Sequence, residues 1–212
     1  MTRPQLFGRS ASHFTRVARM VAIEAGVDLD FRVILDIKSL DAEAYGGHPA
    51  LKLPTLVLGE ERVFGSTTIC RRLVQASPAG FTLTWPEAMS PRLQTAWELL
   101  SQAMTSQVQL AFGVTVTGLP VDHLFFVKAA KGLDGAMTWL DERLPDLLAE
   151  LPPGLSLFEI ALFCQLEHLR FRPTAGLRQR PNLDAFQVGF ATRPSAMATP
   201  CELDSPGAGR MA

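Results

Sequence analysis

The sequence has 212 residues, of which 47% are hydrophobic and 19% charged, and its formal net charge is −1. A chain of this length forms one large domain or two small ones around a sizeable core, and its balanced charge gives no electrostatic reason to expect nucleic acid or an anionic membrane as a partner. Its three cysteines, Cys70, Cys164 and Cys201, are far apart and form no CxxC or Cys/His cluster. Neither a disulfide framework nor a metal site is therefore indicated, and reduced thiols in a cytoplasmic protein are expected.

The hydropathy of the chain does not indicate a membrane segment. The first residues, MTRPQLFGRS, lack the apolar core of a signal peptide. Residues 99–121 carry no charge, yet they are rich in Ser, Gln, Thr and Gly and contain Pro120. A membrane span needs about 20 predominantly apolar residues, so we expect this stretch to line a core, a cleft or an interface instead.

The first 76 residues alternate between strand and helix signals. Apolar residues recur at helical spacing from Phe14 to Ala25, and Gly26 follows where a C-terminal glycine cap is expected. The predicted elements are strand 5–8, helix 14–25, strand 31–35, a helical turn at 39–45, a hairpin of strands 55–58 and 62–64, and helix 67–75. This order predicts a small α/β domain over residues 1–76.

The remainder of the chain shows almost only helical signals. Residues 77–87 have the composition of a linker, and helices are predicted over 91–112, 122–144, 157–170 and 183–191. Residues 113–118, GVTVTG, alternate like a strand and are left unassigned. We therefore predict an all-α domain over residues 88–195, followed by a tail, 196–212, that is rich in Ala, Pro, Gly and Ser and poorly ordered.

One helix start in the second domain is well specified by its sequence. Ser156 and Glu159 have the spacing of a capping box, in which each side chain bonds the main-chain N–H of the other residue. Leu155 and Ile160 flank them with the spacing of a hydrophobic staple. Both features predict that a helix begins directly after Ser156.

Ser12 lies between the first strand and the first helix, where free N–H groups and the helix dipole favour an anion. It is either a plain N-cap residue or a hydroxyl that donates to a bound thiolate. The adjacent His13 suggests nucleophilic catalysis by a Ser-His pair, but neighbouring residues on a helix do not face each other. No third orienting residue and no GxSxG elbow is present, which argues against a serine hydrolase.

The stretch LKLPTLVLGEERVFGSTT, residues 51–68, suggests a peptide-binding edge. Proline belongs at a strand start, and a cis bond before Pro54 would turn the backbone of Leu53 toward an extended ligand, as in strand addition. Lys52 would then flank one carboxylate, and Ser66 and Thr67 at a helix start would suit another. These features predict a small thiol peptide with a carboxylate at each end.

Four segments in this order and spacing resemble the glutathione transferase superfamily. LFGRSASHFTRVARMVAIEAG resembles the first strand, active-site loop and first helix of serine-type classes such as tau and zeta, or an unclassified bacterial type. HPALKLPTLVL resembles the stretch around the conserved cis-proline of that superfamily, SLFEIALFCQLEHLRFR its sixth helix and RPNLDAFQVGFATRPSAMAT its C-terminal ending.

The resemblance implies a thioredoxin-like N-terminal domain, βαβαββα, and an all-helical C-terminal domain. It also implies a cytoplasmic homodimer that uses glutathione as co-substrate to conjugate a small hydrophobic electrophile, held in the cleft between the domains, in detoxification. Ser12 would be the catalytic residue, donating to the glutathione sulfur. The implied glutathione-binding residues are Phe14, Lys38, Lys52, Leu53, Pro54, Ser66 and Thr67. Met104, Gln107 and Phe112 are candidates for the electrophile pocket.

The sequence also departs from the pattern of that superfamily. Gly65 stands where an acidic or amide residue usually meets the γ-glutamyl ammonium, a contact worth about 1.5–3 kcal/mol. His48 replaces an Asn, Leu51 a Gly, and His13 a Pro or Cys. No cysteine lies at positions 10–15, which disfavours thiol–disulfide exchange. An alternative is therefore a weakly active or non-catalytic binding protein on the same fold, and a third reading is an interaction module whose own chain fills the cleft.

Overall fold

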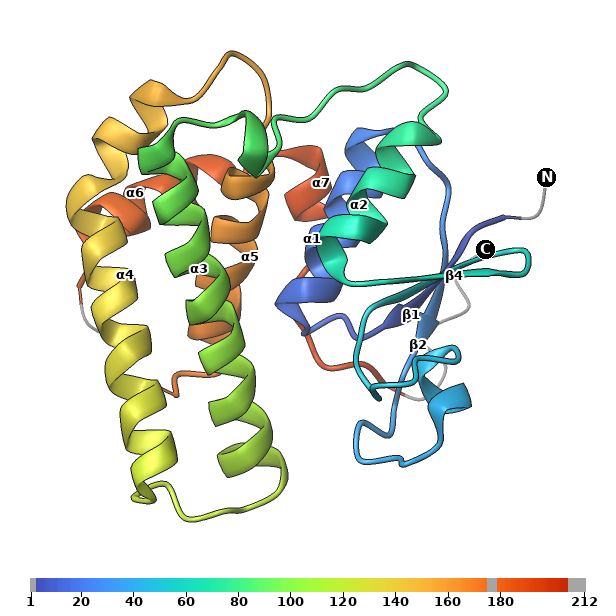
Figure 1. Cartoon of the computed structure of the whole chain (residues 1–212), viewed down its shortest axis with the longest axis horizontal. Coiled ribbons are helices and arrows are strands. Elements are labelled where there is room, and N and C mark those ends of the chain that lie inside the picture. The colour runs from blue at the N-terminus through green and yellow to red at the C-terminus, as the bar shows by residue number, and fades with distance from the viewer. Residues whose placement is uncertain (1–2, 175–178, 206–212) are drawn as a thin grey trace. The chain divides into compact units, whose positions relative to one another are not determined.

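The computed structural model describes residues 3–174 and 179–205 (Figure 1). These residues form two compact units. The first unit combines the chain up to Thr82 with the C-terminal stretch from Arg193 onward, and the second unit is Leu83–Thr192.

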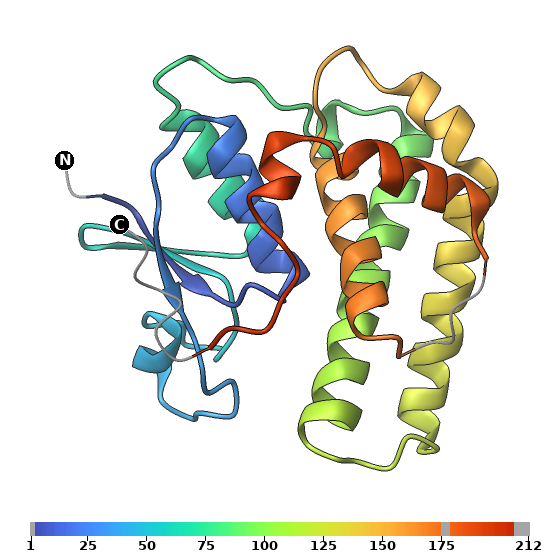
Figure 2. The same cartoon turned by 180° about the vertical axis from the view of Figure 1, so that it is seen from behind.

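The first unit contains a four-stranded sheet in the order β2-β1-β3-β4. Strands β1 (Gln5–Gly8) and β2 (Asp30–Val33) are parallel, whereas β3 (Thr55–Leu58) is antiparallel to both β1 and β4 (Glu61–Phe64). Helices α1 (His13–Glu24) and α2 (Ser66–Gln75) lie side by side against the sheet, and the 3-10 helix η1 (Ala42–Tyr45) follows β2 (Figures 1 and 2). This is the predicted thioredoxin-like arrangement, and the prediction is confirmed.

Helix α1 buries one apolar face, as its periodicity predicts. Val17, Ala18, Val21 and Ala22 are buried, and so is Leu6 of the central strand β1. Ala25 ends the helix and Gly26 follows with a φ of 67°, a left-handed conformation that glycine adopts without a steric penalty. The glycine cap predicted from the sequence is therefore present.

The C-terminal stretch differs from the prediction of a poorly ordered tail from Ala196 onward. Helix α7 (Pro194–Met197) and residues 198–205 have defined positions in the first unit. Thr199 is fully buried, and its main-chain carbonyl accepts a hydrogen bond of 2.7 Å from Nε of the buried Arg16. Composition alone misses this because one buried cation, 183 positions earlier in the chain, fixes the segment. Residues 206–212 of the predicted tail lie outside the described residues.

The second unit is helical. Its elements are η2 (Pro86–Ala88), α3 (Pro91–Leu110), η3 (Ala111–Val116), α4 (Leu124–Glu150), α5 (Leu157–Phe171) and α6 (Pro181–Phe190). Helices α3 and α4 pack along each other (Figure 1), and most residues of α5 are buried. The capping box of Ser156 and Glu159 is present at the start of α5, and Leu155 and Ile160 are both buried. No helix in the described ranges has the length and apolar character that crossing a membrane requires.

Two helical segments of the second unit differ from the sequence prediction. The unassigned residues 113–118 overlap a π-helix, η3, that extends α3 instead of forming a strand. Helix α4, predicted over 122–144, continues through Pro145 to Glu150. Proline removes one helical hydrogen bond, so a helix that continues through Pro145 needs another donor for the carbonyl four residues earlier.

Candidate functional site

Ser12 is the N-cap residue of α1. Its backbone is extended (φ −75°, ψ 118°), and its Oγ accepts a hydrogen bond of 3.2 Å from the N–H of Thr15. The N-cap reading of the sequence is therefore confirmed. A hydroxyl that accepts a hydrogen bond still has its own hydrogen to donate, and Ser12 is partly exposed while Ala11 and His13 on either side are buried. Its hydroxyl can thus reach a ligand.

A close approach of β1 to α1 sets the loop that carries Ser12. A Cβ atom at Gly8 would lie 2.4 Å from Cγ2 of Thr15, so only glycine fits at the end of β1. The loop then turns tightly, and the N–H of Ser12 donates to the carbonyl of Arg9 at 3.1 Å. The result is a short turn between the end of β1 and the start of α1.

The Leu53–Pro54 peptide bond is cis. Pro54 is buried and Leu53 is partly exposed. Within residues 3–174 and 179–205, no hydrogen bond satisfies the main-chain N–H or C=O of Leu53. An extended peptide needs such a donor and acceptor pair for strand addition.

The strand register brings the predicted residues to one end of the sheet. Thr55 pairs with Phe7 of β1 and with Phe64 of β4. One further step along the same register aligns Pro54 with Gly8 on one side and with Gly65 on the other. The loop that carries Ser12, the main chain of Leu53 and the start of α2 therefore converge at this end of the sheet, which we call the cis-proline edge.

Helix α2 begins at this edge without a side-chain cap. Its N-cap residue is Gly65, with φ 80° and ψ 126°, which has no side chain and makes no side-chain cap hydrogen bond. Ser66 and Thr67 are the first two helical residues, and both are partly exposed. Free N–H groups at a helix start, together with the positive end of the helix dipole, favour a carboxylate.

The two predicted lysines lie in different surroundings. Lys52 is exposed and directly precedes Leu53 at the cis-proline edge. Lys38 is exposed in the loop between β2 and η1, and its main-chain N–H bonds the carboxylate of Asp36. Phe14 is partly exposed in the first turn of α1, with its ring centroid 4.6 Å from that of His13.

His48 lies close to Lys52 and is buried. Its Nδ1 accepts a hydrogen bond of 3.1 Å from the N–H of Ala50, and its ring packs 4.4 Å from that of Phe64. Burial is the largest influence on the imidazole and lowers the pKa of His48, and the positive charge of Lys52 lowers it further. The neutral ring thus works as a turn acceptor beside the cis-proline edge.

The candidates for the electrophile pocket belong to the second unit. Met104 and Gln107 are buried in α3, and Phe112 is 40% exposed on η3. The side-chain amide of Gln107 contacts Nδ1 of His168 at 3.1 Å and donates to the carbonyl of Arg172 at 2.9 Å. Gln107 therefore ties α3 to α5 inside the unit.

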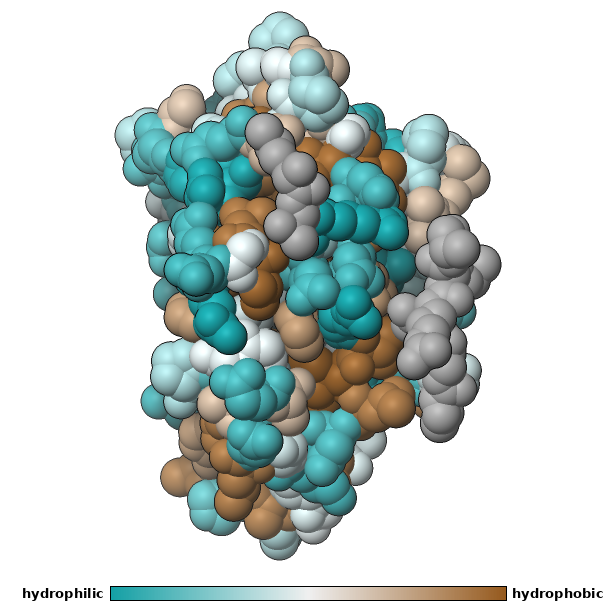
Figure 3. Space-filling view, turned by 90° about the vertical axis from the view of Figure 1, so that its right-hand side faces the viewer, coloured by the Kyte–Doolittle hydropathy of each residue, from teal (hydrophilic) through white to brown (hydrophobic). Residues whose placement is uncertain are grey.

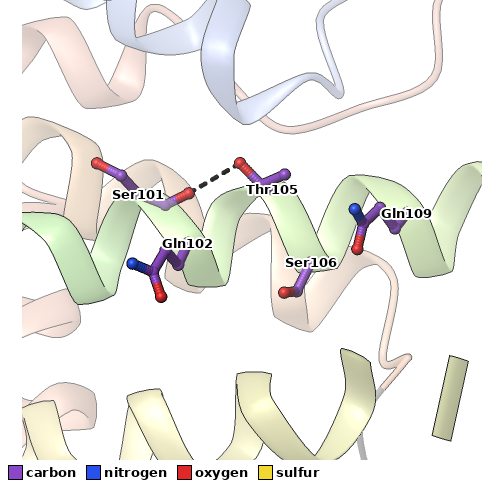
Figure 4. A pocket seen from close by; sticks show the side chains of 5 residues that line it. All are labelled: Ser101, Gln102, Thr105, Ser106 and Gln109. Atoms are coloured by element: carbon purple, nitrogen blue, oxygen red, sulfur yellow. Dashed lines mark hydrogen bonds between the residues drawn. The ribbon is translucent and has the colours of Figure 1, made fainter. Parts of the chain in front are cut away.

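A pocket on α3 contains none of these three candidates. It is lined by Ser101, Gln102, Thr105, Ser106 and Gln109 (Figure 4). Thr105 Oγ1 donates to the carbonyl of Ser101 at 3.0 Å, as Figure 4 shows. The five lining residues are all polar and uncharged, and none is one of the hydrophobic or aromatic residues that usually line a site for a small hydrophobic molecule.

Sequence reasoning did not connect the C-terminal residues with the loop that carries Ser12. Asp204 contacts Arg9 and Ser10, and Cys201 contacts Ala11. These pairs are separated by about 190 residues or more in the chain, and no local pattern in the sequence indicates them. Among the residues that the structure describes, no group of three or more His, Cys, Asp or Glu side chains is placed to hold a metal ion.

Comparison with known proteins identifies the fold. Residues 6–80 match the family model of the glutathione S-transferase N-terminal domain. No curated protein sequence matches the chain. A glutathione transferase family member from Pseudomonas fluorescens Pf-5, solved with bound glutathione, has a TM-score of 0.77 and 23% identity over 94% of this chain and 100% of its own.

Two further solved structures give the same result. A glutathione S-transferase from Methylobacterium radiotolerans in complex with glutathione sulfonate has a TM-score of 0.73 and 20% identity, and both chains are covered in full (100%). One from Methylobacillus flagellatus KT, with glutathione bound, has a TM-score of 0.72 and 22% identity over 93% of this chain and 98% of its own. Residues 6–80 thus match a glutathione S-transferase N-terminal domain, and the chain has the fold of the glutathione transferase superfamily.

Proposed function

We propose that this protein is a glutathione transferase that uses Ser12 to activate the glutathione thiol for attack on a small hydrophobic electrophile. The observation that carries the proposal is the convergence of Ser12, the unpaired main chain of Leu53 and the uncapped start of α2 at the cis-proline edge. The solved structures that share the fold include several with glutathione or a derivative bound.

Each part of the edge suits one part of glutathione. The main chain of Leu53 would pair with the cysteinyl unit, as an added strand does. The N–H groups and hydroxyls of Ser66 and Thr67 would hold the γ-glutamyl carboxylate. Lys52 would attract the glycyl carboxylate, with Lys38, 14 positions earlier in the chain, as a weaker second candidate, and Phe14 would pack beside the sulfur.

The chemistry follows from the pKa of the thiol. A free thiol with a pKa near 8.5 is only a few per cent thiolate at neutral pH. Donation from the Ser12 hydroxyl, together with the dipole of α1, stabilises the anion and lowers that pKa. The thiol proton leaves to solvent, and the thiolate forms a carbon–sulfur bond to the electrophile, which either releases a leaving group with its bonding electrons or, in an addition, takes up a proton.

The first experiment is glutathione titration by calorimetry combined with conjugation assays on a panel of electrophiles. We expect binding and turnover by the natural chain, and a fall of about 100-fold or more in kcat/KM for Ser12→Ala, the loss typical of one donor to a developing anion. Ser156→Ala removes the N-cap of α5 instead and controls for lost stability, since it should leave the rate unchanged. Equal rates for the natural chain and Ser12→Ala would remove Ser12 from the mechanism.

A non-catalytic or weakly active binding protein is the second candidate, and Gly65 favours it. That residue offers no side chain at the start of α2, so no carboxylate or amide there meets the γ-glutamyl ammonium. Calorimetry separates the two candidates, because no heat at millimolar glutathione would favour the second.

We further propose that the protein is a homodimer in the cytoplasm. Hydrophobic side chains gather into patches on the face shown in Figure 3, and exposed apolar residues cluster from the end of α3 to the start of α4, at Phe112, Leu119, Val121, Leu124 and Phe125. Exposed hydrophobic patches often mark a protein interface. The three cysteines are free thiols, which suits a reducing compartment. Light scattering on the purified protein would measure the number of subunits.

A further inference from the structure

The C-terminal segment 193–205 runs from the C-terminal half of α1 to the loop before this helix. Within the first unit, Glu24 near the end of α1 accepts hydrogen bonds from Arg193 at 3.2 Å and from the hydroxyl of Ser195 at 2.6 Å. Arg16, near the start of α1, holds the carbonyl of Thr199 at 2.7 Å. After α7 the chain passes the N-terminal end of α1, as Figure 2 shows.

The segment then reaches the residues that precede Ser12. Cys201 Sγ donates to the main-chain carbonyl of Ala11 at 3.6 Å. Asp204 accepts hydrogen bonds from the N–H of Ser10 at 3.0 and 3.3 Å through its two carboxylate oxygens, and one of these oxygens lies 3.7 Å from Nε of Arg9. The Asp204 side chain is only 2% exposed. All three residues before Ser12 are therefore in contact with this segment.

The hydrogen bonds of Asp204 stabilise the loop more than an ion pair on the surface would. A buried carboxylate that accepts a main-chain N–H makes a charge-assisted hydrogen bond, and solvent does not compete for it at 2% exposure. The loop it holds is short, since the N–H of Ser12 bonds the carbonyl of Arg9. A shift of Ser10 is therefore transmitted to Ser12.

We propose that Asp204 is a positioning residue that fixes the loop of residues 9–12 and so sets where the Ser12 hydroxyl points. The inference rests on the proposed function of Ser12, and it adds a part of the site that lies outside the N-terminal domain of residues 6–80. Donation to a thiolate requires the hydroxyl at hydrogen-bond distance, and a misplacement of about 1 Å can cost up to 100-fold in rate. Asp204 therefore acts on the reaction through Ser12 and does not touch the thiol.

The test compares Asp204→Ala with Asp204→Asn, which keeps one acceptor oxygen, and with Glu202→Ala. Glu202 is an exposed acidic residue of the same segment and serves as the matched control. Hydrogen exchange of the amides of residues 9–12 reports on the loop directly. Steady-state kinetics with glutathione and an electrophile report on the consequence for Ser12, and thermal unfolding checks that each variant is folded.

For Asp204→Ala we expect amide exchange at Ser10 to become about tenfold faster and kcat/KM for glutathione to fall about tenfold, with the KM of the electrophile unchanged. Asp204→Asn should show smaller changes in both the amide exchange at Ser10 and kcat/KM, and Glu202→Ala should match the natural chain in both. Unchanged exchange at Ser10 in Asp204→Ala would overturn the inference, and so would faster exchange without any loss of rate. If the natural chain neither binds nor turns over glutathione, the proposed function fails first; the exchange at Ser10 then decides alone whether Asp204 holds the loop.

Discussion

The side-chain amide of Asn182 donates a hydrogen bond of 2.8 Å to the main-chain carbonyl of Asp141. In a regular helix that carbonyl would accept from the N–H four residues later, but position 145 is a proline and has none. The carboxylate of Asp141 in turn accepts from the N–H of Leu183 at 2.9 Å. Asn182 at the start of α6 thus repairs the bond that Pro145 removes from α4.

The relationship between Asn182 and Pro145 predicts that substitutions at the two positions are energetically coupled. Asn182→Ala leaves the carbonyl of Asp141 without a partner and should lower the free energy of unfolding by about 1–3 kcal/mol. Pro145→Ala restores an N–H at position 145, so Asn182→Ala should cost less in that background. Urea unfolding of the two single variants and the double variant measures the coupling. Strictly additive effects would show that Asn182 and Pro145 act independently.

His48 predicts a dependence of stability on pH. Its pKa is lowered in the folded state, first by burial and then by Lys52, so the unfolded chain binds a proton at higher pH than the folded one. Stability from the neutral ring is therefore complete above the unfolded pKa of 6.5 and is lost as pH falls from there toward the lower folded pKa.

We expect the free energy of unfolding to fall between pH 7.5 and pH 5.5 in the natural chain, and to fall less in His48→Asn, which keeps an acceptor for the Ala50 N–H without titrating. Urea unfolding at several pH values measures both slopes. Equal slopes would mean that other groups cause the dependence.

Gly65 predicts opposite effects of one substitution on stability and on affinity. Its φ of 80° and ψ of 126° are costly for any residue with a Cβ, so Gly65→Ala and Gly65→Glu should each lower stability by about 1–3 kcal/mol. The space at the site is open, with Thr68 Oγ1 the nearest atom at 3.9 Å from the added Cβ.

Only Gly65→Glu adds a carboxylate for the γ-glutamyl ammonium, and it should bind glutathione about tenfold more tightly, because such a contact is worth about 1.5–3 kcal/mol. Glutathione titration by calorimetry on Gly65→Glu and Gly65→Ala separates the effect of the added carboxylate on affinity from the effect of backbone strain. A similar gain in affinity for Gly65→Ala would contradict the role of the carboxylate.

Leu51 is the only described residue other than glycine with a positive φ, at 53°. The left-handed conformation costs a branched side chain about 1–2 kcal/mol, and glycine avoids this at a smaller entropic cost. Leu51→Gly should therefore raise the free energy of unfolding by about 0.5–1 kcal/mol, measured by urea unfolding. Leu53→Gly is the matched control, because Leu53 has no positive φ and the same change there should lower stability.

Local patterns predicted most of the fold. The helical spacing after Phe14, the glycine cap at Gly26 and the capping box at Ser156 each depend on residues only a few positions apart, and each is present. The resemblance to the glutathione transferase superfamily likewise depends on four continuous segments. These signals sufficed for the order of the elements and for the superfamily.

Contacts between distant segments escaped the same reasoning. Helix α4 continues beyond Leu144 because Asn182, in another helix, supplies the missing donor. Residues 198–205 have defined positions because Arg16 and Ser10 bind them. Neither partner is signalled by the composition or the periodicity around the segment it fixes.

The first unit is built from both ends of the chain, and this has a consequence for synthesis on the ribosome. The chain emerges from its N-terminus, so strands β1 to β4 are made long before Arg193, Thr199 and Asp204 exist. Until then the hydrogen bonds from Arg193 to Glu24 and from Arg16 to Thr199 cannot form. A nascent chain that ends near Thr82 should therefore be more open to proteases around α1 than a chain that contains residues 193–205, and these residues should close that helix and its loop once they are made.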